Sequence, residues 1–213
     1  MPTPTRVLAA TALALLLIPR SAAPVDEAAG QERLGVRVGY IETFDGLYAS
    51  YGSGWDLTLF FHEKLYSKVL LDIRLGAIYL GDARNPDLDD QITLSPGIVS
   101  EMRFLYFSAG PLAGFKLGNA NSGYVSAGIG IYSASMVFDS GIAAFDYSDQ
   151  HIGFNGGLGL SRRISTNWSV ELNGTVHYFS VDENPSDLYY LFTGGADAPL
   201  LAGFALALTV DLR

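Results

Sequence analysis

The three histidines are the residues of this sequence best suited to acid–base chemistry. His177 is followed by Ser180 and Glu183, which together offer a base, a hydroxyl nucleophile and an orienting acid. Side chains of a β-strand alternate between its two faces, so residues three apart point in opposite directions. His177 and Ser180 lie in a run with strand periodicity, and the base and nucleophile would therefore face opposite sides. We predict no catalytic residue here.

The other two histidines have weaker partners. His62 is separated from Ser67 by a turn, and His151 begins a strand beside Asp149, where we expect a residue at the rim. The chain has no cysteine, which excludes disulfides and thiolate metal sites. Its acidic stretches hold no D-x-D-x-D-G run of the kind that calcium loops use. The sequence predicts no metal site and no cofactor.

A larger set of polar residues occupies alternating positions in the predicted strands. We expect them to point into a barrel interior: Arg37, Asp56, Asp72, Arg74, Glu101, Arg103, Lys116, Arg163, Glu171 and His177, with Lys64 and Asp211 in the same phase. Buried charge is tolerated only when it is paired. The set predicts either a structural network of ion pairs or a narrow polar pore, and the small interior of an eight-stranded barrel favours the network.

The elements that must position these residues are clearest in the last third of the chain. Residues 151–164, 168–181 and 200–213 each alternate large apolar side chains with small or polar ones. The period is two, which indicates strands. These runs are longer than the five or six residues of an average strand and match what a tilted strand needs to cross a bilayer. The pattern predicts an all-β, closed antiparallel transmembrane barrel.

The strand count has two solutions. Six further runs alternate: residues 34–44, 55–61, 68–81, 92–101, 105–118 and 123–138. Nine strands conflict with the even number of bacterial barrels. With short turns at 62–67, 102–104 and 165–167, eight strands cross and one run, such as 123–138, belongs to an outer loop. With a short strand at 46–51, ten cross. We favour eight, because short periplasmic turns and long outer loops are the usual arrangement.

Residues 1–23 have the features of a cleaved secretory signal peptide. Arg6 precedes the apolar run 7–18, and small residues reach a cleavage site after Ala23. As a helix this run would span only about 18 Å, too short for a membrane anchor. Residues 24–33 are an acidic periplasmic lead-in, and residues 34–213 form the barrel. Removing Arg6 and Arg20 from 13 basic residues leaves 11 against 22 acidic ones, which argues against nucleic-acid binding.

The aromatic residues near strand ends agree with a membrane location. Trp and Tyr prefer the membrane–water interface, and an aromatic belt is expected from Tyr40, Trp55, Tyr79, Phe104, Trp168 and Tyr178. A soluble, lipocalin-like barrel is the alternative, and it would need its apolar face inside. Many glycines fall at inward positions, where they leave room for large inward neighbours.

The closing segment HIGFNGGLGLSRRISTNWSVELNGTVHYF, a loop and LLAGFALALTVDL together resemble the small outer-membrane β-barrel proteins of the OmpA-like and OmpW-like kind. Such proteins usually end in an aromatic residue, whereas this chain ends Asp211-Leu212-Arg213. The resemblance implies a monomer in the bacterial outer membrane that meets membrane lipids, lipopolysaccharide and, during biogenesis, the barrel-assembly machinery. It implies no enzymatic activity, but a role in envelope structure, surface interaction or small-solute passage. A lipid-modifying enzyme of the lipid A deacylase or acyltransferase type is the alternative.

Overall fold

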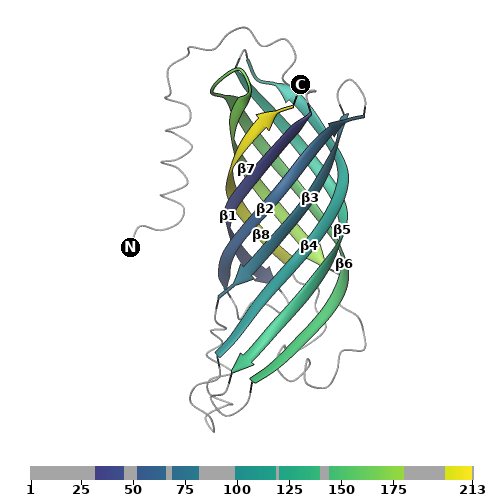
Figure 1. Ribbon diagram of the computed structural model, residues 1–213, viewed down its shortest axis with the longest axis vertical. Coiled ribbons are helices and arrows are strands. Elements are labelled where there is room, and N and C mark those ends of the chain that lie inside the picture. The colour runs from purple at the N-terminus through teal and green to yellow at the C-terminus, as the bar shows by residue number, and fades with distance from the viewer. Residues whose placement is uncertain are drawn as a thin grey trace, which may run out of the picture.

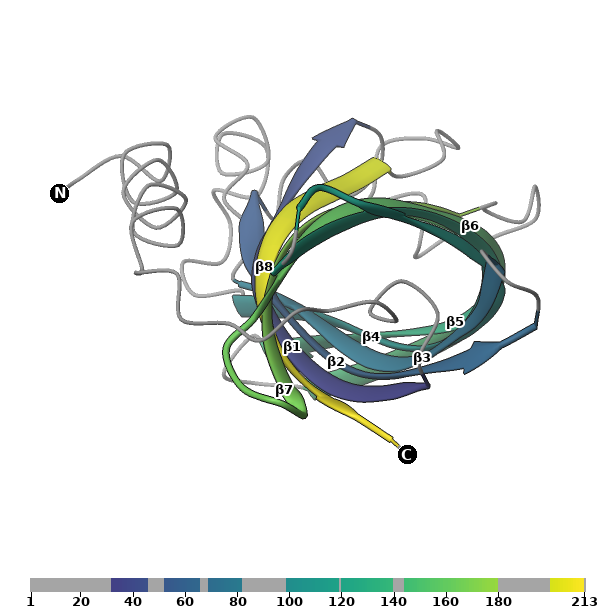
Figure 2. The same ribbon diagram turned by 90° about the horizontal axis from the view of Figure 1, so that it is seen from above.

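The computed structural model describes residues 32–45, 52–65, 69–81, 99–118, 120–139, 144–179 and 200–212. The signal peptide, most of the lead-in, the run 46–51 and Ser180 and Glu183 lie outside these residues. The described chain forms a closed barrel of eight antiparallel strands, each paired with its sequence neighbour and β1 paired with β8 (Figures 1 and 2). The strands are β1 (Arg33–Asp45), β2 (Ser53–Lys64), β3 (Val69–Leu80), β4 (Val99–Lys116), β5 (Asn121–Asp139), β6 (Ala144–Arg163), β7 (Trp168–Phe179) and β8 (Leu200–Asp211). The predicted fold class is confirmed.

The outer face of the barrel carries the large apolar side chains. On β8, Leu206 and Leu208 are 44% and 46% exposed, whereas Ala205 and Ala207 between them are buried. The same alternation places Leu158, Ile131 and Leu105 outside on other strands. An apolar outer face and a polar, small-residue interior suit a barrel surrounded by lipid, and they are the reverse of a soluble lipocalin-like barrel. The described residues include no helix long and apolar enough to span a bilayer.

Strand β4 corrects the predicted division of this region. Residues 99–116 form one strand, with no turn at 102–104, and the turn lies instead near Leu117, whose amide donates to the Asn121 carbonyl at 3.0 Å. The run 123–138 is consequently part of the transmembrane strand β5 and not of an outer loop. The predicted count of eight strands is confirmed. The described residues 99–101 of the run 92–101 join the run 105–118 in the single strand β4. The ladder between β4 and β5 skips Gly110 and Pro111 without a change of register.

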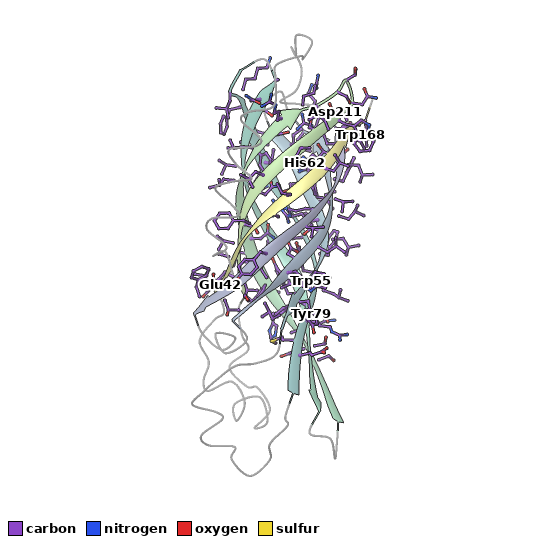
Figure 3. All side chains as sticks on the ribbon, turned by 90° about the vertical axis from the view of Figure 1, so that its left-hand side faces the viewer. Glu42, Trp55, His62, Tyr79, Trp168 and Asp211 are labelled. Atoms are coloured by element: carbon purple, nitrogen blue, oxygen red, sulfur yellow. The ribbon has the colours of Figure 1, made fainter. Side chains whose placement is uncertain are left out.

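The two ends of the barrel differ. One end, called here the turn end, carries three tight turns, and the Leu65 and Ile164 amides close two of them on Val69 and Trp168. The start of β1 and the finish of β8 are also there, because Arg33 pairs with Asp211. Figure 3 shows Asp211, Trp168 and His62 toward this end and Glu42, Trp55 and Tyr79 toward the other, the loop end. The predicted turn at 165–167 lies at the turn end. Of the turn predicted at 62–67, residues 62–64 are instead the end of strand β2, and Leu65 follows them at the turn end.

Strands β4, β5 and β6 are 18, 19 and 20 residues long, whereas the others have 12 or 13. The extra length projects beyond the rest of the barrel at the loop end (Figure 1). Register confirms the projection, because β3 ends opposite Met102 while β4 continues with β5 to the pair of Val99 with Asp139. A three-stranded sheet therefore extends out of the barrel wall.

Candidate functional site in the barrel interior

The interior holds four arginines and four carboxylates on described strands, which makes its charge balanced. They are Arg33, Arg37, Arg74 and Arg163 with Asp56, Asp72, Glu171 and Asp211. All are at most 7% exposed except Arg163, whose side chain is 16% exposed. They form three connected groups, and in each group every arginine has a carboxylate within ion-pair distance.

The first group joins β1, β2 and β4 through Thr58. Arg37 Nη2 donates to Thr58 Oγ1 at 3.1 Å, and the Tyr106 hydroxyl lies 2.7 Å from the same oxygen. Thr58 and Tyr106 also reach Asp56 Oδ1, at 3.0 and 3.3 Å. The Asp56 carboxylate, 3.7 Å from Arg37 Nε, is thus held mainly by two hydroxyls. Charge and hydrogen bonding together offset the cost of burying it.

The second group is centred on Arg74 and spans β2, β3, β5 and β6. Arg74 forms a two-pronged contact with Asp72, with Nε at 2.8 Å, and also donates to Ser126 Oγ at 2.6 Å and Asn155 Oδ1 at 3.2 Å. The other Asp72 oxygen lies 3.4 Å from His62 Nε2. One guanidinium therefore ties side chains of three strands together, a task for which its planar fork of donors is well suited.

The third group lies at the turn end, where the first and last strands close the barrel. Arg33 Nε is 2.8 Å from Asp211 Oδ1, and Arg163 Nη2 donates to Asp211 Oδ2 at 3.0 Å. Glu171 is 3.6 Å from Arg33 and accepts a hydrogen bond from the Tyr124 hydroxyl at 3.2 Å. Asp211 on β8 therefore bridges β1 and β6, so this group reinforces the seam of the barrel.

On the loop-end side of these groups, apolar and aromatic side chains meet across the lumen. We call this cluster the apolar layer: Ile41, Ile78, Leu80, Met102, Phe104, Tyr106, Tyr132, Ala134, Phe179 and Leu201, all at most 1% exposed. Phe104 of β4 stacks on Phe179 of β7 with ring centroids 5.2 Å apart, and Tyr132 packs on Phe179 at 4.2 Å. Rings from three strands thus touch where an open pore would need space.

His177 sits at the border between the apolar layer and the charged groups. It is fully buried, its Nδ1 lies 3.1 Å from the Tyr132 hydroxyl, and its ring meets Tyr106 edge-on at 5.2 Å. Tyr132 in turn accepts a hydrogen bond from Asn155. The contacts of His177 therefore link the polar groups to the aromatic rings. Among the described residues, no three His, Asp or Glu side chains are placed to hold a metal ion.

Glycines make room for the tyrosines that carry these hydroxyls. A Cβ at Gly76 would overlap the ring of Tyr106, and a Cβ at Gly159 would overlap the ring of Tyr124. Each tyrosine is the cross-strand partner of that glycine on a neighbouring strand. This is the use that the sequence pattern predicted for inward glycines.

The structure places seven of the ten predicted interior residues in the lumen: Arg37, Asp56, Asp72, Arg74, Arg163, Glu171 and His177. Asp211 is there as well. Glu101 and Arg103 are on the outer face, because Met102 and Phe104 hold the inward positions of β4. Both charges can face outward because they lie on the loop-end side of the apolar outer band, where the outside of the wall is no longer apolar. Lys64 and Lys116 are exposed at the turn end, each as the last residue of its strand.

Several interior residues were missed. Arg33 falls within the predicted lead-in, although it stands four residues before Arg37 and hence in the same phase of β1. Tyr106 lies in the predicted run 105–118 but is not among the predicted interior residues. Phe104, predicted for the aromatic belt, is inside the apolar layer. The other five belt residues, Tyr40, Trp55, Tyr79, Trp168 and Tyr178, do lie on the outer face.

No family model and no curated protein matches the sequence. Solved structures match the fold. Neisserial surface protein A superposes with a TM-score of 0.55 at 11% identity, covering 85% of this chain and 97% of that one. A major outer membrane protein from Thermus thermophilus gives a TM-score of 0.54 at 14% identity, covering 84% and 99%. The chain has the fold of the small outer-membrane β-barrel proteins, as the sequence resemblance implied.

Proposed function

We propose that this protein is an integral, non-enzymatic barrel of the bacterial outer membrane whose lumen is closed, and that it acts in envelope structure and surface interaction. The apolar outer band and the outward belt aromatics support the membrane location. The likeness to a surface protein and to a major outer membrane protein supports the outer membrane. Export through a cleaved signal peptide at residues 1–23 remains part of the proposal.

The observation that carries the closed lumen is the apolar layer. Its ten side chains come from β1, β3, β4, β5, β7 and β8, and none is more than 1% exposed. A conducting path needs a continuous file of water, and stacked rings such as Phe104 on Phe179 occupy the interior at that level, which supports a closed lumen. The paired charges below the layer then serve to fill and cross-link the interior. Small-solute passage is the role that this arrangement favours least.

Single-channel recording tests the closed lumen. The full chain, refolded and inserted into planar bilayers, is expected to give no conductance steps above baseline. The double variant Phe104→Ala/Phe179→Ala provides the positive control, because removing both rings thins the layer and should produce openings. Regular steps from the wild-type protein would contradict the proposal and restore a transport role.

Two further measurements test location and activity. Membrane fractionation of cells that express the full chain should recover it with the outer membrane, and recovery in the soluble periplasm would contradict the proposal. Incubation of the refolded barrel with lipopolysaccharide or phospholipid should release no acyl chains. Acyl release that is lost in His177→Ala would establish the enzymatic alternative instead.

A further inference from the structure

His151 and Asp149 form a pair on the inner face of β6 toward the loop end. They are two residues apart, so both side chains point to the same side of the strand. Gly153, the next inward position toward the turn end, pairs with Phe179, the last residue of β7. The pair therefore lies at the loop-end edge of the apolar layer. Each of the four interior arginines has another carboxylate within ion-pair distance, so this pair is separate from the charged groups of the lumen.

The imidazole of His151 is buried and has no hydrogen-bond partner at Nε2. Asp149 Oδ2 lies 3.9 Å from this nitrogen, which is too long for a hydrogen bond. The His151 side chain is 2% exposed and that of Asp149 is 36% exposed, so the carboxylate can be reached from solvent. A buried polar atom without a partner is unfavourable. A ligand bound between the two side chains would give Nε2 the partner that it lacks.

The distance between the two side chains fits one small ion. The Gln150 amide donates to Asp149 Oδ1 at 2.7 Å, which orients the carboxylate and presents Oδ2 to His151. An ion bonded to an imidazole nitrogen and a carboxylate oxygen, each at about 2.0–2.2 Å, holds these two atoms about 3 to 4 Å apart, depending on the angle at the ion. The observed 3.9 Å is within that range. An ion can therefore join Nε2 and Oδ2 with little movement of β6.

The two ligand types indicate which class of ion this place would take. Calcium and magnesium are bound by oxygen ligands, whereas imidazole combined with carboxylate suits zinc, copper and nickel. Two protein ligands leave the remaining coordination positions to water. An ion bound in this way exchanges with solvent and is held more weakly than one in a structural site with four protein ligands.

The other two histidines lack this arrangement. His62 Nε2 lies 3.4 Å from Asp72, but the same carboxylate binds Arg74, whose positive charge opposes a second cation. His177 is fully buried, and its ring nitrogen Nδ1 faces a tyrosine hydroxyl instead of a carboxylate. His151 is thus the one histidine that combines an unpartnered nitrogen with a carboxylate open to solvent.

We infer that His151 Nε2 and Asp149 Oδ2 bind a divalent transition-metal ion of the zinc or copper class at the loop end of the barrel. The site goes beyond the proposed structural and surface role, because it gives the loop end a specific small ligand. It depends on the geometry of β6 and not on whether the lumen conducts.

Copper titration followed by electron paramagnetic resonance tests the site in the untagged full chain, folded in detergent. We expect one bound Cu²⁺ per chain with a hyperfine pattern from nitrogen. His151→Gln should abolish this pattern, since it removes the nitrogen ligand. Asp149→Asn should weaken copper binding at least about tenfold, because even the loss of an outer-shell partner of a metal ligand commonly costs that much.

His62→Gln is the matched control. It removes an imidazole that also has a carboxylate neighbour but lies toward the turn end, and it should leave copper binding unchanged. Competing ions test the class of metal. Excess Zn²⁺ should displace the copper, whereas Ca²⁺ at the same concentration should not, because calcium takes oxygen ligands.

Three results would overturn the inference directly: no bound Cu²⁺ in the wild-type chain, a nitrogen pattern that survives His151→Gln, or one that is lost equally in His62→Gln. Displacement by Ca²⁺, or unchanged affinity in Asp149→Asn, would overturn it as well. Each variant is first shown to be folded by its faster migration in unheated detergent gels. Asp149→Asn alters a partly exposed side chain without changing its size, so it tests the site even where a histidine variant does not fold.

Discussion

The middle of the barrel wall and the loop-end part of strands β4 to β6 have opposite polarity. In the embedded part, Leu206 and Leu208 face outward while Arg37 and Arg74 are inside. In the sheet formed by β4 to β6, Arg103, Ser133 and Gln150 face outward, while Met102, Phe104 and Ala134 are inside. The first arrangement is that of a lipid-facing wall, and the second is that of a water-soluble protein. One continuous strand can thus satisfy two solvents, provided its alternation inverts at the boundary.

The largest effect should come from leaving a buried charge alone in the embedded part. Arg74→Ala removes the partner of Asp72 and the two hydrogen bonds to Ser126 and Asn155, and we expect a loss of about 3–5 kcal/mol in the free energy of unfolding. Urea titration in micelles measures it. The double variant Asp72→Asn/Arg74→Ala should recover part of the loss, and an additive result would show that the two residues do not interact.

A similar loss is expected in the apolar layer for a different reason. Phe179→Ala removes a ring that contacts Phe104 and Tyr132 and leaves a cavity, which costs about 3–5 kcal/mol. The same titration measures it. Phe179→Leu, which keeps most of the volume, should cost clearly less, and an equal cost would mean that ring contacts rather than filled volume stabilise the layer.

Gly76→Ala is expected to destabilise the barrel by about 1–3 kcal/mol, because the new Cβ would overlap the Tyr106 ring. Gly52→Ala is unsuitable as its control, since Gly52 has a positive φ of 66°. Gly174→Ala is suitable, because its Cβ would have no neighbour closer than 3.9 Å. The difference in unfolding midpoint between the two variants measures the crowding.

The smallest effect on stability should come from the outer face of β4 toward the loop end. Arg103→Gln breaks an exposed ion pair with Glu101, and such pairs contribute at most about 1 kcal/mol. The unfolding midpoint should hardly move. A large loss of stability would instead assign Arg103 a structural role in holding β4 against β3.

The inversion also explains which features the sequence could predict. Residues 168–178 of β7 and 203–211 of β8 keep one polarity, and their faces were predicted correctly from period two alone. In β4, Glu101 and Arg103 alternate with Met102 and Phe104 in the opposite sense from the residues that follow. Composition alone assigned the charges to the inside and the aromatic ring to the belt. Only the register of β4 against β3 and β5 fixes the true phase, and a single sequence does not contain it.

For a related reason, the sequence could not predict which interior charges pair with each other. Arg74 reaches Ser126 and Asn155, which are 52 and 81 residues away along the chain, and these contacts depend on the curvature of the closed sheet. Charge balance was visible as a nearly equal count of positive and negative side chains. The carboxylate that pairs with each arginine, and the glycine that makes room for each tyrosine, could be identified only from three-dimensional positions.

The seam between β1 and β8 has a consequence for how this molecule is made. Arg33 pairs with Asp211 and Leu34 with Val210, so the contacts that close the cylinder join the two ends of the folded chain. Contacts between such distant residues form slowly, because a long loop must first be closed. Until they form, both edge strands expose unpaired backbone groups, a state that invites association between molecules. Assembly should therefore be limited by the last strand, and a nascent barrel that lacks β8 should depend on a chaperone until closure.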